Sequence, residues 1–164
     1  MVCLLSDLAT AVLIAVPTSS EYKIYTDPLR VGQAVEVVYL APSEGSLSVS
    51  LESAKGDIAF SINTQYEAKG KEKNIFGEFK SKKANGQQFS DLFCGCSLWA
   101  GLVNLQIEMG TDAFIVGVNG AVLRKHPYIF NLDYSIVTKV KWTYCEAGAT
   151  KKAHLKFLGI DIEL

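Results

Sequence analysis

The chain has 164 residues, of which 49% are hydrophobic and 20% are charged. This length and composition are typical of a single globular domain with its own core, and they argue against long disordered tails. The formal net charge is −1, with 16 basic and 17 acidic residues interspersed, so no summed field attracts the chain to nucleic acid or anionic lipid. No stretch reaches the roughly 18 apolar residues of a membrane-spanning helix. We therefore expect no nucleic-acid partner and no membrane insertion.

The first apolar stretch, Val12–Val16, resembles the apolar segment of a signal peptide. However, no basic segment precedes it, Asp7 interrupts the apolar residues before it, and Pro17–Ser20 is a poor cleavage signal. We therefore expect a structural arm or a first strand here.

Over most of the chain, apolar residues alternate with polar ones and turn residues interrupt them at short intervals, which predicts an antiparallel sandwich or barrel. In the segment Ile58–Asn63, Ile58, Phe60 and Ile62 share one face, so Ser61 and Asn63 must lie on the other. The strands expected in chain order are Val35–Leu40, Leu47–Leu51, Ile58–Asn63, one beginning at Asn74–Phe76, Leu102–Ile107, Ala113–Val118, Ile136–Trp142 and an edge strand in the tail, Ala153–Leu164.

The expected connections are short. Ala41–Gly45 and Ala54–Asp57 are turns, and Asn85–Gly86 and Asn119–Gly120 are tight hairpin turns because both residue types tolerate positive φ. Glu67–Lys73 is polar and rich in lysine, so we expect a solvated loop there.

The four cysteines, Cys3, Cys94, Cys96 and Cys145, match no zinc-binding spacing. The cysteines therefore predict no zinc site, and no other motif in the sequence indicates a cofactor. A disulfide between the Cys94/Cys96 pair and Cys145 is possible, although reduced thiols are favoured because a fold of this size needs no staple.

Three segments, taken in order, resemble the galectin family: Leu29–Gln33, Gly56–Phe60 and Phe114–Gly120, the last reading F-x-V-x-V-N-G. The resemblance covers about residues 29–142. It implies an all-β, two-sheet antiparallel jelly-roll sandwich. Residues 1–164 would form one domain, with a core of about 22–142, an N-terminal arm and a C-terminal edge-strand extension. It also implies partners that are glycans or glycoproteins, bound as β-galactosides on the concave sheet without metal.

The family's binding signature keeps its spacing here, but most of its residues are replaced. The positions of His, Asn and Arg on one strand fall on Ser61, Asn63 and Gln65, and Asn63 alone among them is unchanged. The carbohydrate-binding residues implied by the resemblance are therefore Ser61, Asn63, Gln65, Glu78, Asn85, Gln88 and Ser90.

Asn85 stands where the family has a tryptophan that packs on the sugar, and such aromatic packing contributes about 0.5–1.5 kcal/mol beyond area burial. Tyr66, Phe79 and Phe89 flank the expected site and are candidates to replace this platform, although ordinary core or rim packing is the favoured interpretation of each. Trp99 and Trp142 lie in apolar contexts, so we expect them in the core.

Three functions are compatible with these substitutions. The first is a lectin with a remodelled pocket for β-galactosides or N-acetylgalactosamine-containing glycans. The second is a structural or protein-interaction module that has lost sugar binding, and the third is an enzyme acting on carbohydrates. The enzyme is disfavoured, because neither His126 nor His154 accompanies a nucleophile motif and the acidic residues are scattered. We identify no catalytic residue.

Two further expectations concern the whole molecule. Sandwiches expose edge strands and multivalency raises avidity, so we expect a homo-oligomer with its interface in residues 1–28 and 143–164. Galectins typically lack a signal peptide and act inside and outside cells, which implies a cytoplasmic or extracellular location, or both. The lysines between Lys69 and Lys83 either attract acidic glycans or serve solubility.

Overall fold

The computed structural model describes residues 12–15, 19–23, 28–69, 72–130, 134, 137–146 and 152–157, and the side chains of 28–67, 74–130, 134 and 137–141. In this part the chain is almost entirely β-strand, with one short 3-10 helix, η1 (Ser97–Trp99). The strands are β1 (Val12–Ala15), β2 (Ser19–Lys23), β3 (Ala34–Leu40), β4 (Gly45–Ser53), β5 (Ile58–Lys69), β6 (Glu72–Lys82), β7 (Gln88–Cys94), β8 (Leu102–Met109), β9 (Ala113–Val118), β10 (Ala121–Pro127), β11 (Val137–Glu146) and β12 (Lys152–Phe157).

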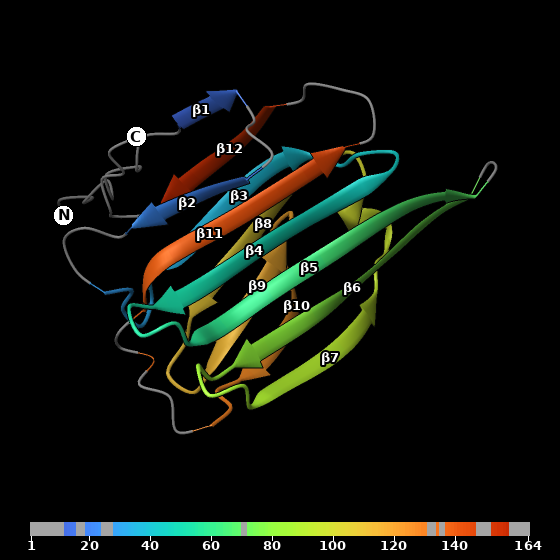
Figure 1. The fold of residues 1–164 in the computed structure, drawn as a ribbon. Coiled ribbons are helices and arrows are strands. Elements are labelled where there is room, and N and C mark those ends of the chain that lie inside the picture. The colour runs from blue at the N-terminus through green and yellow to red at the C-terminus, as the bar shows by residue number, and fades with distance from the viewer. Residues whose placement is uncertain are drawn as a thin grey trace, which may run out of the picture.

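Two six-stranded sheets face each other (Figure 1). The first has the order β1-β12-β3-β8-β9-β10 and the second, which we call the front sheet, has the order β2-β11-β4-β5-β6-β7. All strand pairs are antiparallel. The predicted all-β, two-sheet antiparallel sandwich is therefore confirmed. No helix in the described residues is long and apolar enough to cross a membrane.

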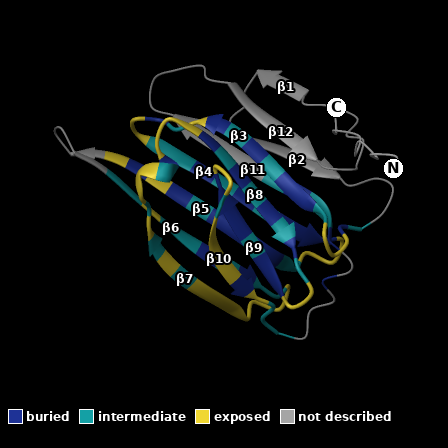
Figure 2. Cartoon of the chain, turned by 180° about the vertical axis from the view of Figure 1, so that it is seen from behind, coloured by how far each residue is buried: buried dark blue, intermediate teal, exposed yellow. Residues whose placement is uncertain are grey.

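The core lies between the sheets and draws on both of them (Figure 2). Alternate residues of each strand turn inward, and Phe60 of the front sheet packs against Phe114 of the other, with ring centroids 5.2 Å apart. Trp99 is 2% exposed, as predicted for a core residue, whereas the side chain of Trp142 lies outside the described residues. Burying aromatic and aliphatic side chains in this way supplies the main favourable term for folding.

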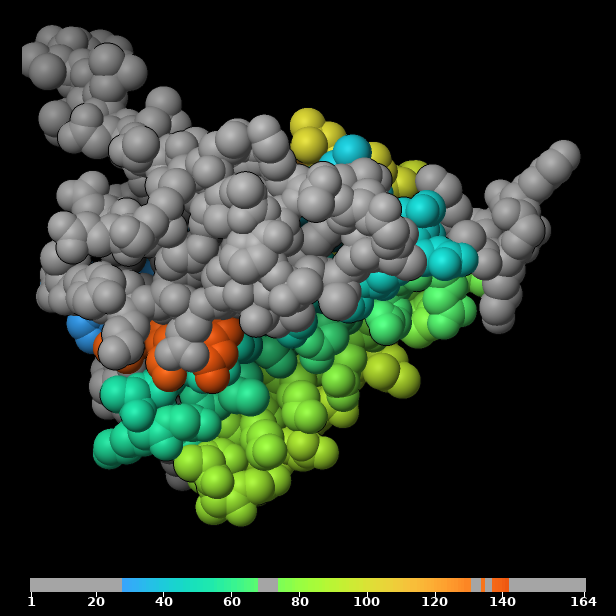
Figure 3. Space-filling view, turned by 45° about the horizontal axis from the view of Figure 1, so that its top comes forward, coloured from blue at the N-terminus to red at the C-terminus, as the bar shows by residue number. Residues whose placement is uncertain are grey.

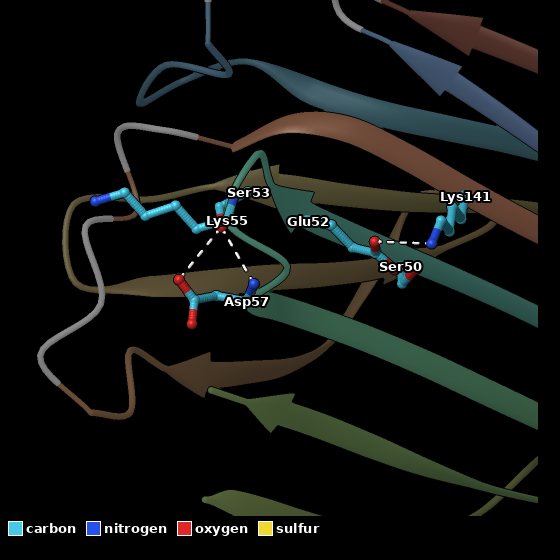
Figure 4. A network of polar contacts seen from close by, with 6 residues as sticks. All are labelled: Ser50, Glu52, Ser53, Lys55, Asp57 and Lys141. Atoms are coloured by element: carbon cyan, nitrogen blue, oxygen red, sulfur yellow. Dashed lines mark hydrogen bonds and ion pairs between the residues drawn. The ribbon is translucent and has the colours of Figure 1, made fainter. Parts of the chain in front are cut away.

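The segment Gly56–Phe60, one of the three that resemble the galectins, has a structural role. The Oγ of Ser53 accepts hydrogen bonds from the backbone amides of Lys55 and Asp57, which closes the turn between β4 and β5 (Figure 4). The Oδ1 of Asp57 then accepts a hydrogen bond of 2.9 Å from the backbone amide of Ala84. The Asp57 side chain thus ties the β4–β5 turn to the β6–β7 hairpin.

The segment ending in Asn119–Gly120 is structural as well. Both residues have positive φ, of 50° and 81°, which is the geometry of the tight hairpin turn predicted between β9 and β10. The Oδ1 of Asn119 accepts a 2.7 Å hydrogen bond from the backbone amide of Asn104, and its Nδ2 donates to the carbonyl oxygens of Leu98 and Leu102. One side chain therefore holds the turn against β8 and the loop before it.

Some sequence predictions are wrong. Most of the expected loop Glu67–Lys73 is strand, because β5 runs to Lys69 and β6 begins at Glu72, and the register sets these two residues of opposite charge against each other. The tail strand is not at an edge, since β12 lies between β1 and β3. The strand β10 was not predicted, because a bulge between Val122 and Arg124 breaks its period-two pattern.

The disulfide that the sequence left possible is not formed. Cys94 and Cys96 are free thiols. Cys145 lies on β11, and three strands, β4, β5 and β6, separate β11 from β7, which ends at Cys94. Adjacent strands are about 4.8 Å apart, so these two backbones are on the order of 19 Å apart, far beyond the reach of a disulfide.

Candidate functional site

The outward face of the front sheet carries a mixed polar and apolar cluster. Asn63 on β5 lies opposite Glu78 on β6, and Glu78 in turn lies opposite Leu92 on β7. Gln65 lies opposite Phe76. Residues directly opposite each other in antiparallel strands point to the same side of a sheet, so these five side chains share one face. Their inward neighbours, such as Ile62 and Phe79, are buried in the core.

This face is hollowed by a groove with a volume of about 480 Å³. Small-molecule sites are typically concavities of roughly 300–1,000 Å³, so the groove has room for a small ligand. In the space-filling view, β4 to β7, coloured teal through green, form the continuous face that contains it (Figure 3). The groove is lined by Ser46, Leu47, Ser48, Asn63, Thr64, Gln65, Phe76, Gly77, Glu78 and Leu92.

The polar groups of the groove include both donors and acceptors. The Ser48 hydroxyl donates a 2.5 Å hydrogen bond to Oδ1 of Asn63, which fixes the amide and leaves its Nδ2 as a donor toward the groove. Gln65 is exposed and adds a second amide, and the half-buried Glu78 supplies a carboxylate. Such a set can bind hydroxyl groups, which both donate and accept.

The apolar wall of the groove consists of Phe76 and Leu92, with exposed fractions of 39% and 77%. Sequence reasoning missed both of them. A period-two signal for Phe76 was present, since it lies two residues before Glu78 on the same strand.

The three aromatic residues that were candidates for the sugar platform lie elsewhere. Tyr66 is 5% exposed, its hydroxyl is 2.6 Å from that of Tyr39, and burial raises its pKa to about 12 against the opposing effect of this hydrogen bond. Phe79 is 2% exposed and stacks on Phe60 and Phe93. Phe89 is partly exposed and packs beside His126 on the inner side of β7. None of the three lines the groove.

Four of the seven predicted site residues do not line the groove either. Ser61 is on the outward face as predicted, but it is 5% exposed, enclosed between Ser50 and Lys80 of the neighbouring strands. Ser90 lies opposite Lys80, two residues further along β6 than Glu78, and Gln88 lies further still. The groove therefore includes Asn63, Gln65 and Glu78, and carbohydrate binding by any of the seven residues stays a prediction.

The fourth of these residues, Asn85, accepts a hydrogen bond within its own turn. Its Oδ1 accepts a 3.1 Å hydrogen bond from the backbone amide of Gln87. Hydrogen bonds from Gly86 N to Lys83 O and from Lys83 N to Gln87 O close a three-residue hairpin loop, with positive φ at Gly86 and not at Asn85. The residue that replaces the family's tryptophan thus has a local structural role.

The described residues contain no group of three or more His, Cys, Asp or Glu side chains that could hold a metal ion. The groove itself has amide, hydroxyl, carboxylate and apolar groups, which suits non-covalent recognition of a polar ligand with an apolar face.

Two comparisons with known proteins found no relative. No protein-family model matches the sequence, and no curated protein matches it.

Comparison with solved structures identifies the fold. The architecture is that of the galectins, a class of β-sandwich proteins. A tetrameric galectin from the ball sponge Cinachyrella sp. is similar with a TM-score of 0.63 and 23% identity over 84% of this chain and 94% of that one. Sheep galectin-11, solved in complex with glycerol, has a TM-score of 0.62 and 15% identity over 90% of this chain and 99% of its own. A variant of human galectin-16 has a TM-score of 0.58 and 15% identity over 92% and 97%. The chain therefore has a galectin-like fold.

Proposed function

We propose that the protein is a galectin-like lectin that binds a neutral glycan, a β-galactoside or an N-acetylgalactosamine-containing sugar, in the groove between β4 and β7. One observation carries the proposal: Asn63, Gln65 and Glu78 line the same groove as Phe76 and Leu92. A pyranose has hydroxyl groups around its rim and an apolar C–H face, and the groove offers a partner for each.

Phe76 is the proposed stacking residue. It is the aromatic side chain among the groove's lining residues, and part of its ring faces solvent. Packing a sugar face on this ring replaces the contact that Asn85 does not supply. The aromatic platform is thus shifted from the hairpin loop to the middle of the sheet.

Charge supports a neutral ligand. Glu78 is the charged residue among those that line the groove, and no lysine or arginine lines it. A partly buried carboxylate beside the ligand disfavours a second negative charge, whereas it accepts hydrogen bonds from neutral hydroxyls strongly. The lysines between Lys69 and Lys83 are therefore assigned to solubility rather than to acidic glycans.

A binding role is favoured over glycoside hydrolysis. Hydrolysis of a glycosidic bond ordinarily uses two carboxyl groups that flank it, roughly 5–10 Å apart. The lining of the groove contributes one, Glu78.

The test is a glycan array followed by calorimetric titration of the best neutral ligand with the wild type, Phe76→Ala and Ser90→Ala. Ser90 is the matched control because it is on the same sheet face but outside the groove. The loss of about 0.5–1.5 kcal/mol of aromatic packing predicts a Kd at least about 2- to 10-fold weaker for Phe76→Ala, and no change for Ser90→Ala. An array with no neutral glycan above background would reject the lectin, and a reversed pattern in the two variants would move the site to the hairpin.

A second function is favoured by the apolar wall. Leu92 is the most exposed of the large hydrophobic residues described, and with Phe76 it would suit the side chains of a peptide. A protein-interaction module of this kind predicts that Asn63→Ala and Gln65→Ala leave partner binding unchanged. Inhibition of partner binding by free sugar would exclude it.

We also propose that the protein forms a homo-oligomer. The sponge galectin of similar fold is tetrameric. Light scattering of the purified protein tests this, and a monomeric mass at micromolar concentration would contradict it.

A further inference from the structure

Two free thiols lie beside a second, smaller cavity. Cys94 is the last residue of β7 and Cys96 immediately precedes η1, and both are exposed. Both line a cavity of about 210 Å³, together with the aromatic rings of Phe93 and Trp99 and the guanidinium-bearing Arg124. This cavity has no lining residue in common with the proposed glycan groove.

The backbone between the two cysteines is held in an extended form. The amide of Gly95 donates a 2.7 Å hydrogen bond to the carbonyl of Ile75, and Cys96 has φ of −111° and ψ of −175°. A Cβ built on Gly95 would lie 2.4 Å from the Cγ2 of Ile75, so the glycine is fixed closely against β6. The segment Cys94–Cys96 therefore cannot fold toward itself without losing this contact.

An extended backbone suits a metal bridge better than a disulfide. Residues two apart in a strand have Cβ atoms roughly 6.6 Å apart, whereas a disulfide requires Cβ atoms about 3.5–4.5 Å apart. Two thiolates on opposite sides of one metal ion, in a linear arrangement, have sulfurs about 4.6 Å apart when each metal–sulfur bond is about 2.3 Å, against about 2.05 Å in a disulfide. Rotation of the two side chains closes the wider gap without moving the backbone.

The number of ligands selects the ion. Zinc takes four ligands in structural sites, and the described residues contain no cluster of three metal-binding side chains. Copper in its monovalent state is soft, prefers thiolates, and is satisfied by two of them. We infer that Cys94 and Cys96 form a two-coordinate site for Cu(I).

The surroundings of the thiols favour this ion. Two thiolates and one Cu(I) carry a net charge of −1, and the Arg124 side chain lines the same cavity. Arg124 is held there by its ion pair with Asp91 and by the ring of Phe79, 5.6 Å from the guanidinium carbon. The rings of Phe93 and Trp99, stacked with centroids 5.2 Å apart, form an apolar wall of the same cavity.

The test is an anaerobic titration of the reduced protein with Cu(I), in competition with the chromophoric chelator bathocuproine disulfonate. We expect one Cu(I) per chain for the wild type and for the double variant Cys3→Ser/Cys145→Ser, and X-ray absorption should give two sulfur ligands. Cys94→Ser and Cys96→Ser should each weaken binding more than about 100-fold, because even changes outside the coordination shell cost about 10–100-fold. Circular dichroism confirms that each variant is folded.

Two results would overturn the site. One is retention of tight binding by either single variant, or its loss in the Cys3/Cys145 double variant. The other is rapid formation of a Cys94–Cys96 disulfide under mild oxidation with diamide, found by peptide mass analysis, because it would show that the backbone is not held extended.

Discussion

Protonation of His126 is expected to destabilise the fold. His126 is 1% exposed, and its Nε2 lies 3.1 Å from the Oγ of Ser81, which donates its own proton to the carbonyl of Ala59 at 2.8 Å. The ring packs edge-on against Phe60, at 5.1 Å, and Arg124 is two residues away on the same strand. Among the described residues, no carboxylate pairs with the ring to compensate a charged imidazolium.

The size of the effect follows from the pKa. Burial first, and then the positive charge of Arg124, lower the pKa of His126 from 6.5 to about 4. The unfolded state binds the proton more readily than the folded state does. The contribution of neutral His126 to the free energy of unfolding is therefore fully present above about pH 6.5 and is lost as the pH falls toward 4. One pKa unit corresponds to about 1.4 kcal/mol of the free energy of unfolding. The protein therefore loses about 2 kcal/mol of stability at about pH 5, and about 3 kcal/mol once the pH is below the pKa of the folded state.

The assay compares urea unfolding of the wild type with that of His126→Gln, at about pH 7.5 and about pH 5. Glutamine is neutral at both values and can still donate to Ser81. All other ionisable residues are the same in both proteins, so their contributions cancel in the difference. Between the two pH values the wild type should lose about 2 kcal/mol more than the variant. Equal losses would refute the view that His126 is forced to stay neutral.

Three further predictions concern stability at neutral pH and are checked by chemical denaturation. Gly77→Ala should cost about 1–3 kcal/mol, because its Cβ would lie 2.4 Å from both the Asn63 carbonyl oxygen and the Phe93 ring; an unchanged midpoint would contradict this packing. Thr64→Val should stabilise the protein by about 1 kcal/mol, since the buried Thr64 hydroxyl has no hydrogen-bond partner; a loss of stability would mean that the hydroxyl is satisfied. Asn119→Ala should lower the stability by about 2 kcal/mol, because alanine loses the side-chain hydrogen bonds and is strained at positive φ. Asn119→Gly loses the same hydrogen bonds but adopts positive φ without strain, so it should lower the stability less.

The fold was largely predictable because two local signals agree with the global architecture. Alternation in Leu47–Leu51 and Ile58–Asn63 requires one buried face, and the structure has strands at both. The Asn119–Gly120 turn has the residue types that its φ values demand. Alternation fails where a strand lies at an edge and bulges, which explains why β10 was missed, and it cannot show which strands are neighbours, which explains the misplacement of β12.

The sequence predicted which face of the sheet carries the candidate site, but not which residues along the strands line the groove. Period two correctly set Ser61, Asn63 and Gln65 on the outward side of β5. Which of them is open to a ligand depends on the size of the neighbours across the strands, and Ser61 is enclosed by residues of β4 and β6. Aligned spacing contains no information on this enclosure. Aligned spacing likewise did not single out Phe76, although period two sets Phe76 on the same side of β6 as Glu78 and sets Phe79 on the opposite side.

The segments that resemble the galectins explain why the fold is retained while the site differs. Asp57 and Asn119 hold two turns by hydrogen bonds to backbone groups, and neither side chain lines the groove. Replacing either residue leaves backbone groups without a hydrogen-bond partner, and this lowers the stability of the fold whichever ligand the protein binds. The groove residues Gln65 and Glu78 make no such hydrogen bond to a backbone group in the described structure, so the fold does not constrain their identities in this way. Under the proposed function, a galectin-like sandwich therefore keeps its turns while Phe76 takes the role of the aromatic platform.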